Sequence, residues 1–327
     1  MPFVPGVPSV PGVPSVPSIP SVPSVPSVPS IPSVPSVPSA PGVPGVPGAP
    51  GAPGVPGDPG DPGRSLPQLR SLTLLELDLQ DESSFRHVAL YADLKARLVR
   101  DGYRVQVLPT HAQRWDHALL LNLAFWDARG GGDTLVDEGL PADVVCHMAW
   151  HHLAAAALGD GDQPLAAHAM LLGEAIASAF DIYLIGRLIG HAPDSDFLQT
   201  QLPAMAEVAE SADVSAGAFV ALMETVRADP EQAFEDLRCL LFDVSTELLA
   251  ATSPDEALAA LLRHEDNRFA CLLHHFELAS WLQHARAAPT NGSSETAAGL
   301  DATLRQQAVS LNWLAETWLG RATCPAT

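Results

Sequence analysis

The chain has 327 residues, of which 38 are Asp or Glu and 17 are Lys or Arg, so its formal net charge is −21 at pH 7. Such an acidic surface repels phosphate backbones and anionic lipids, so we expect neither nucleic acid nor a membrane surface as a partner. The four cysteines are scattered and form no Cys-x-x-Cys pair, and there is neither a signal-like start nor an uncharged apolar run of membrane-spanning length, which predicts a cytoplasmic protein.

Residues 1–63 consist almost entirely of tandem repeats of one three-residue pattern. From Gly6 to Gly63 every third residue is Gly or Ser, and each of these is preceded by Pro. Proline fixes φ and removes a backbone donor, so this segment is expected to be a disordered arm of polyproline II character. It is the part of the chain that we expect to contact a protein partner, because a preformed extended arm loses little entropy on docking.

Two other interpretations of the arm stay open. A simple spacer has the same composition. The Gly-X-Pro triplets of 42–63 are collagen-like, but Ser takes the glycine phase from Ser15 to Ser39, where a triple helix needs Gly at its axis.

The composition changes at Arg64, the first of the Lys and Arg residues, which also include Lys95, the only lysine. The predominance of Ala, Leu and Arg is typical of a GC-rich bacterium. We expect a mainly α fold in which a small mixed α/β lobe at 64–140 precedes a helical lobe at 141–327.

In the first lobe, residues 72–79 alternate loosely, 84–100 have helical spacing and 103–108 are typical of a strand. The apolar run 118–126 fits either a strand or a helix, and the glycines at 130–132 indicate a turn. Residues 287–299 are small and polar and are predicted to be a mobile loop. The helices of the second lobe are predicted at 143–158, 164–189, 196–209, 215–228, 230–251, 254–262, 268–286 and 300–320.

The residues most able to carry chemistry lie on the first two of these helices. His147 and His151 are one turn apart on a common face, a spacing at which two imidazoles can bind one metal ion. On the next helix, Glu174 and Asp181 share a face with Ser178, and the short turn at 159–162 lets the two helices pack as neighbours. Glu174 is therefore a candidate third ligand.

Around these residues, from Val144 to Tyr183, the chain resembles the gluzincin metallopeptidases, whose pattern is His-Glu-x-x-His followed by a downstream Glu. The resemblance implies zinc bound by His147, His151 and Glu174. It also implies a strand-containing lobe before the site and a helical lobe after it.

The chain departs from that pattern at Met148, which stands where the family has the Glu that accepts a proton from zinc-bound water. A thioether cannot act as a general base. Only His152 or Asp181, approaching from another side, would restore hydrolysis, so the resemblance favours a zinc-binding domain over a working peptidase.

Alternatives to this site remain. The histidine pair also fits structural polar contacts, such as a buried His bonded to a carboxylate. His274 and Glu277, three residues apart, would extend the cluster to a dinuclear site in a helical bundle, although the usual Glu-x-x-His order is absent. Trp313 and Trp318 are expected to pack in the core.

Three functions follow from these patterns. The first is a zinc-bearing, non-proteolytic domain that acts in binding or assembly through its Pro-rich arm. The second is a metal-dependent hydrolase with a displaced general base. The third is a metal-free helical adaptor, or the cargo of a compartment, docked by the arm.

Overall fold

The computed structural model describes residues 69–109, 134–159, 165–288 and 294–320. All of them belong to one compact unit, 62–327. The arm at 1–63, the apolar run 118–126 and the glycines at 130–132 lie outside the described residues. The fold is mainly α with a small strand-containing region near its N-terminal part, as expected.

The strand-containing region holds two small sheets. One has the strand order β1-β3-β4, with β1 antiparallel and β4 parallel to β3, and the other pairs β2 with β5 in parallel. Leu94 and Leu98 of the helix Ala89–Arg100 are fully buried, and this helix packs on the first helix of the helical part. The elements are β1 (Arg70–Thr73), η1 (Leu74–Glu76), β2 (Asp78–Gln80), η2 (Ser84–His87), α1 (Ala89–Arg100), β3 (Arg104–Val107), β4 (Thr134–Leu135) and β5 (Gly139–Pro141).

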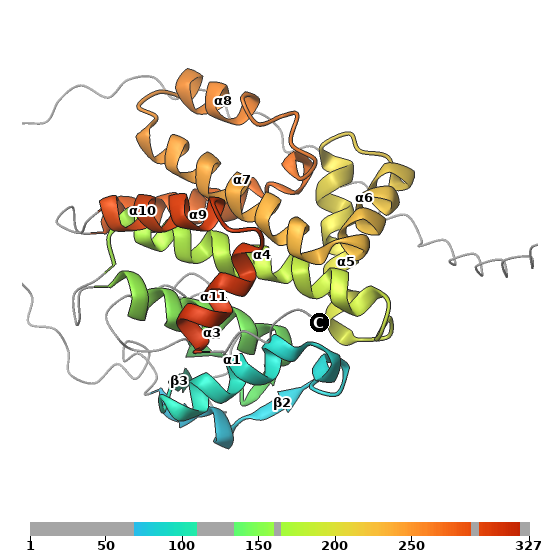
Figure 1. Ribbon diagram of the computed structural model, residues 1–327, viewed down its shortest axis with the longest axis vertical. Coiled ribbons are helices and arrows are strands. Elements are labelled where there is room, and N and C mark those ends of the chain that lie inside the picture. The colour runs from blue at the N-terminus through green and yellow to red at the C-terminus, as the bar shows by residue number, and fades with distance from the viewer. Residues whose placement is uncertain (1–68, 110–133, 160–164, 289–293, 321–327) are drawn as a thin grey trace, which may run out of the picture. The chain divides into compact units, whose positions relative to one another are not determined.

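The helical part surrounds one central helix. Its elements are α3 (Ala142–Leu158), α4 (Ala167–Ile189), α5 (Asp196–Ser211), α6 (Ala216–Ala228), α7 (Pro230–Ala250), α8 (Pro254–Leu262), η4 (Ala270–Leu272), α9 (His275–Ala287), α10 (Ser294–Arg305) and α11 (Ser310–Leu319). Helix α4 packs most extensively on α7 and on α3, and Figure 1 shows it between them.

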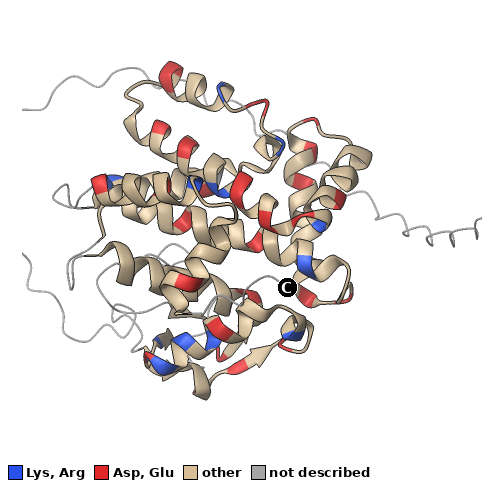
Figure 2. Cartoon of the chain, in the orientation of Figure 1, with Lys and Arg blue, Asp and Glu red and all other residues tan. Residues whose placement is uncertain are grey.

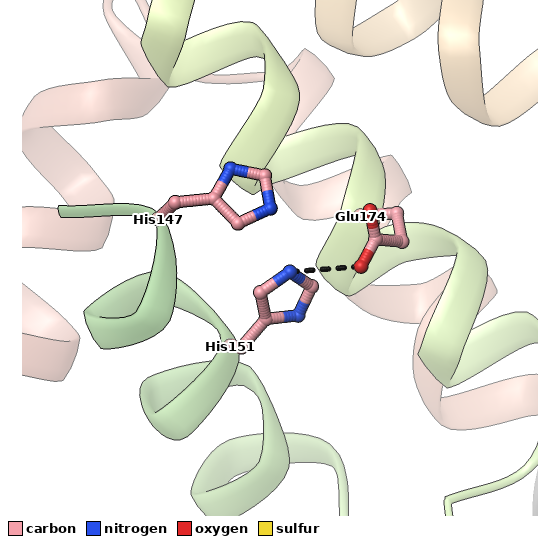
Figure 3. Close-up of side chains that lie close together, drawn as sticks. All are labelled: His147, His151 and Glu174. Carbon is pink, nitrogen blue, oxygen red and sulfur yellow. Dashed lines mark ion pairs between the residues drawn. The ribbon is translucent and has the colours of Figure 1, made fainter. Parts of the chain in front are cut away.

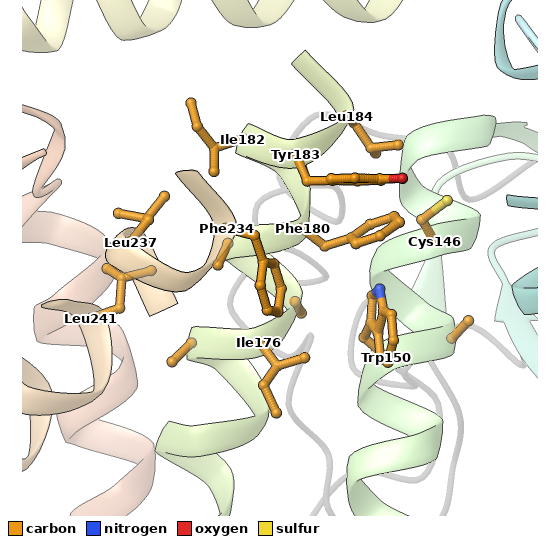
Figure 4. Packing of buried hydrophobic residues seen from close by; sticks show 14 of the residues in the cluster. Cys146, Trp150, Ile176, Phe180, Ile182, Tyr183, Leu184, Phe234, Leu237 and Leu241 are labelled. Carbon is orange, nitrogen blue, oxygen red and sulfur yellow. The ribbon is translucent and has the colours of Figure 1, made fainter. Parts of the chain in front are cut away.

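Helix α4 is buried over most of its surface because most of its residues are apolar. By length and composition alone it could cross a membrane, but 89% of its most apolar window is buried inside the fold, as expected of the core helix of a bundle. Trp150 of α3 packs against Phe180 of α4 with ring centroids 5.4 Å apart, and Phe180 against Tyr183 at 5.0 Å (Figure 4). The two helices that carry the candidate ligands are thereby fixed to each other.

A close backbone approach holds α4 against the other side of the bundle. A Cβ atom at Gly186 would lie 2.6 Å from the carbonyl oxygen of Val226 on α6 and 2.9 Å from the Cβ of Pro230 on α7. Glycine at this position lets the three helices meet.

A buried ionic network joins α7 to the C-terminal helices. Arg238 is fully buried, and its guanidinium donates to Asp301 and to Glu235, both at 2.6 Å. Ser310, the first residue of α11, donates its hydroxyl proton to Glu235, and Arg305 of α10 donates to Asp301 at 2.7 Å.

Most predicted helices are confirmed to within about three residues at each end, but three are divided. The segment 84–100 is the short η2 followed by α1, with Val88 between them. The expected helix 268–286 is the short η4 followed by α9, because the side chain of His274 caps α9 by accepting the backbone N–H of Glu277. The expected helix 300–320 is α10 and α11, and α10 begins at Ser294, inside the predicted loop. No Gly or Pro marks the break between them; there the chain turns so that Ser310 reaches Glu235 on α7.

Candidate functional site

The first part of the site is on α3, which begins after Pro141 and ends at Gly159. Alanine and leucine favour the helix, and its buried residues pack toward α1 and α4. His147 and His151, one turn apart, are partly exposed with side-chain accessibilities of 20% and 22%, and their ring centroids lie 4.8 Å apart. The predicted common face is confirmed.

Glu174 of α4 completes the cluster. Its carboxylate is 3% exposed, and Oε1 lies 2.8 Å from Nε2 of His151. One ligand atom from each of His147, His151 and Glu174 lies within 4.8 Å of the others, and the three side chains point toward one another in Figure 3. The cluster could therefore hold a metal ion, and two imidazoles with one carboxylate are a donor set that suits a divalent transition metal.

Asp181 lies beside the cluster, two turns further along α4. Its Oδ2 is 3.5 Å from Nδ1 of His147. A carboxylate near one ring nitrogen of a histidine orients the ring and leaves the other nitrogen to bind a metal. Asp181, predicted as a candidate base, is thus positioned to orient His147, and it also lines the neighbouring cavity.

His152, the other predicted base, is directed toward the strand-containing region. Its Nε2 lies 2.8 Å from Oδ2 of Asp101, and its ring packs edge-on against Tyr103. Burial opposes ionisation of Asp101, but hydrogen bonds from Arg97 and His152 outweigh it and lower the pKa of Asp101 to about 2. His152 belongs neither to the His-His-Glu cluster nor to the cavity wall.

Met148, which replaces the glutamate of the gluzincin pattern, is fully buried in the hydrophobic core. It does not line the cavity beside the cluster. The side chain after the first histidine therefore contributes to packing.

A cavity of about 590 Å³ adjoins the cluster and has His147 and Asp181 in its wall. Its other walls are α5, α7, η4 and the start of α9, including both His274 and Glu277. The structure thus brings the second predicted histidine and carboxylate pair to the same cavity. Among the described residues, however, only His147, His151 and Glu174 have ligand atoms close enough together to be grouped as a metal site, so the dinuclear arrangement is not seen.

Acidic side chains shape the electrostatics around the cluster. Loss of hydration raises the pKa of Glu277 above its usual range. Attraction from His274 opposes this rise, and repulsion from Glu174 and Asp181 adds to it. Burial and the nearby Asp181 raise the pKa of Asp143 to about 6. Burial also raises the pKa of the Cys146 thiol, which makes it a core residue rather than a nucleophile.

The sequence did not indicate the apolar part of the cavity wall. Met205 comes from α5, Leu237 and Leu241 from α7, and Leu278 and Trp281 from α9. Each is an ordinary apolar residue of an amphipathic helix, and only the packing of the helices shows that these five border an open space.

Comparisons of the chain with protein-family models, with curated proteins and with solved structures find no match. The site is therefore defined by its own geometry as a His-His-Glu cluster at the end of a cavity.

Proposed function

We propose that the chain is a zinc-binding protein that acts in binding or assembly, with a gluzincin-like helical domain that does not cut peptides. The observation that carries this proposal is the convergence of His147, His151 and Glu174 to within 4.8 Å. Two imidazole nitrogens and one carboxylate oxygen form the ligand set of zinc centres that keep a position open for a further ligand. The cavity beside His147 supplies the space for such a ligand.

The absence of peptide cleavage follows from Met148. Its buried thioether can neither accept a proton nor reach the cavity, so the residue that serves as general base in gluzincins has no equivalent at its usual place. The metal would then hold a ligand or stabilise the domain, while the Pro-rich arm at 1–63 contacts the protein partner.

A metal-dependent hydrolase is the second candidate, and one observation favours it. Asp181 and Glu277 both line the cavity together with His147, so two carboxylates border the space where a substrate would lie. Bound zinc would supply Lewis acidity and a water of lowered pKa, and one of these carboxylates would hold the proton. Hydrolysis of model peptides and esters by the zinc-loaded protein, abolished by Asp181→Asn or Glu277→Gln, would favour this candidate over the first.

The metal site is tested by zinc content and affinity. Purified full-length protein is loaded with zinc, dialysed against a weak chelator and analysed for metal, beside a His147→Ala/His151→Ala variant. His191→Ala is the matched control, because His191 is exposed and is not one of the three grouped ligands. We expect about one zinc per chain in the wild type and in the control, and none in the double variant, with all three helical by circular dichroism. Equal zinc in all three proteins, or no zinc in any, would remove the proposal and leave a metal-free adaptor.

The role of the arm is tested separately. A chain that lacks residues 1–63 should keep its helical circular dichroism and its zinc, but should lose the partner that co-purifies with the full chain from its native host. Retention of the partner by the shortened chain would limit the arm to a spacer.

A further inference from the structure

The cavity beside the cluster has two chemically different ends. Its polar end carries His147, Asp181 and Glu277. Its apolar side is formed by Met205, Leu241, Trp281 and their neighbours on α5, α7 and α9. A volume of about 590 Å³ is within the usual range of small-molecule sites. The shape and lining therefore suit an amphipathic small molecule with one polar head.

The charge of the wall restricts the polar head. Asp181, Glu207 and Glu277 are the ionisable acids that line the cavity, and neither Lys nor Arg is present among the described residues of its wall. A carboxylate or phosphate head would meet these acids without a basic side chain to pair with. A neutral head would leave them without a cationic partner.

The two histidines of the wall already have other contacts. Nδ1 of His274 accepts the backbone N–H of Glu277 at 3.3 Å, and His147 is a candidate metal ligand. The carboxylates are therefore the groups of the wall that we expect to select the polar head.

A divalent ion in the cluster would not balance the acids. Glu174 would offset one of its two charges, and three further carboxylates, those of Asp181, Glu207 and Glu277, line the cavity. The wall therefore holds more acidic groups than the ion could pair with. A monovalent cationic head group next to Asp181 and Glu277 would pair with them and gain charge-assisted hydrogen bonds.

We infer that this cavity binds a primary amine with an apolar tail, whose ammonium group lies between Asp181 and Glu277 and whose tail packs on Met205, Leu241 and Trp281. The inference rests on the proposed function only in that the cavity opens at the metal site. The carboxylates and the apolar wall are distinct from the three metal ligands, so amine binding and zinc binding can fail separately.

The head group is tested with three probes of the same tail: octylamine, octanol and octanoate, each below its micelle concentration. Their affinities for the full-length protein are measured by isothermal titration calorimetry, once with zinc and once after chelation. We expect octylamine to bind at least about tenfold more tightly than octanol, because a hydrogen bond to a charged group contributes more than a neutral one, and octanoate to bind most weakly. Equal binding of the amine and the alcohol, or tighter binding of octanoate, would overturn the inference.

Two variants locate the binding site. Glu277→Gln keeps the shape of the side chain and should reduce the preference for octylamine over octanol about tenfold, whereas Glu256→Gln, a matched change on exposed α8, should leave it unchanged. Met205→Trp should weaken all three probes by filling the apolar side. An unchanged preference in Glu277→Gln, or binding of a second zinc ion in competition with the amine, would contradict the assignment. If His147→Ala/His151→Ala loses zinc but still binds octylamine, the amine site is confirmed as separate from the metal site. The zinc measurements then test the metal proposal by themselves.

Discussion

Replacement of Arg238 by methionine should destabilise the fold more than the same replacement of an arginine in an exposed ion pair. The guanidinium of Arg238 is fully buried and donates to Asp301 and Glu235 at 2.6 Å. Methionine retains most of the aliphatic volume but not the charge. Removal of one partner from a buried ionic network typically costs about 3–5 kcal/mol, because the remaining charges stay out of water without a counter-charge.

We expect the free energy of unfolding to fall by about 3 kcal/mol, the lower end of that range. Asp301 keeps a hydrogen bond from Arg305 at 2.7 Å, and Glu235 keeps the hydroxyl of Ser310. Both carboxylates also retain some contact with solvent, with side-chain accessibilities of 21% for Glu235 and 12% for Asp301. Each is thus partly compensated after Arg238 is removed.

The assay is urea unfolding of the full-length protein followed by far-UV circular dichroism, with chelator present so that metal binding adds nothing to the free energy. The matched control is Arg263→Met, because Arg263 also pairs with an acid of α7, Glu247 at 2.6 Å, but its side chain is 57% exposed. An exposed pair contributes at most about 1 kcal/mol. Equal losses in the two variants, or a loss below about 1 kcal/mol for Arg238→Met, would refute the reasoning.

Three further predictions follow from local geometry. Gly186→Ala should lower the free energy of unfolding in urea by about 1–3 kcal/mol, because its Cβ would lie 2.6 Å from the carbonyl oxygen of Val226. Gly299→Ala, whose Cβ would enter open space, should raise it by up to about 1 kcal/mol. The reverse order would exclude the close approach at Gly186. The pKa of Asp101 is about 2 in the fold against 3.8 ordinarily, so ionised Asp101 stabilises the fold above about pH 4 and this stabilisation is lost as the pH falls toward 2. Asp101→Asn should therefore reduce the fall in the free energy of unfolding between pH 4 and pH 2. Parallel plots of the free energy of unfolding against pH for the variant and the wild type would contradict this. Glu174→Gln should lower zinc affinity at least about tenfold in a chelator competition, and unchanged affinity would remove Glu174 from the ligand set.

The part of the site that could be predicted from the sequence is the part fixed by short-range geometry. His147 and His151 share a face because a helix repeats every 3.6 residues. Glu174 joins them because α3 and α4 follow each other through a short connection and pack side by side. Neither step needs knowledge of the remaining fold.

The surroundings of the site depend on contacts between distant segments and could not be predicted. His152 is adjacent to a candidate ligand in sequence, yet Asp101, 51 residues earlier, determines its direction. The cavity exists only because α5, α7 and α9 leave space next to α4. The division of the expected 300–320 helix likewise follows from Ser310 and Glu235, which are 75 residues apart.

The position of α4 has a consequence for how quickly an ion bound by the cluster exchanges with solvent. Figure 2 shows acidic residues on the outer helices, while α4 lies in the middle of the described fold with Glu174 almost wholly enclosed. A buried central helix such as α4 opens only in the unfolding events of highest free energy, so fraying of a chain end does not release an ion bound to Glu174. The cavity offers a route to the cluster along His147 and past α5, whose exposed Glu207 and Ser211 border it. A molecule bound in the cavity would close that route, so it should lengthen the residence time of an ion held by the cluster.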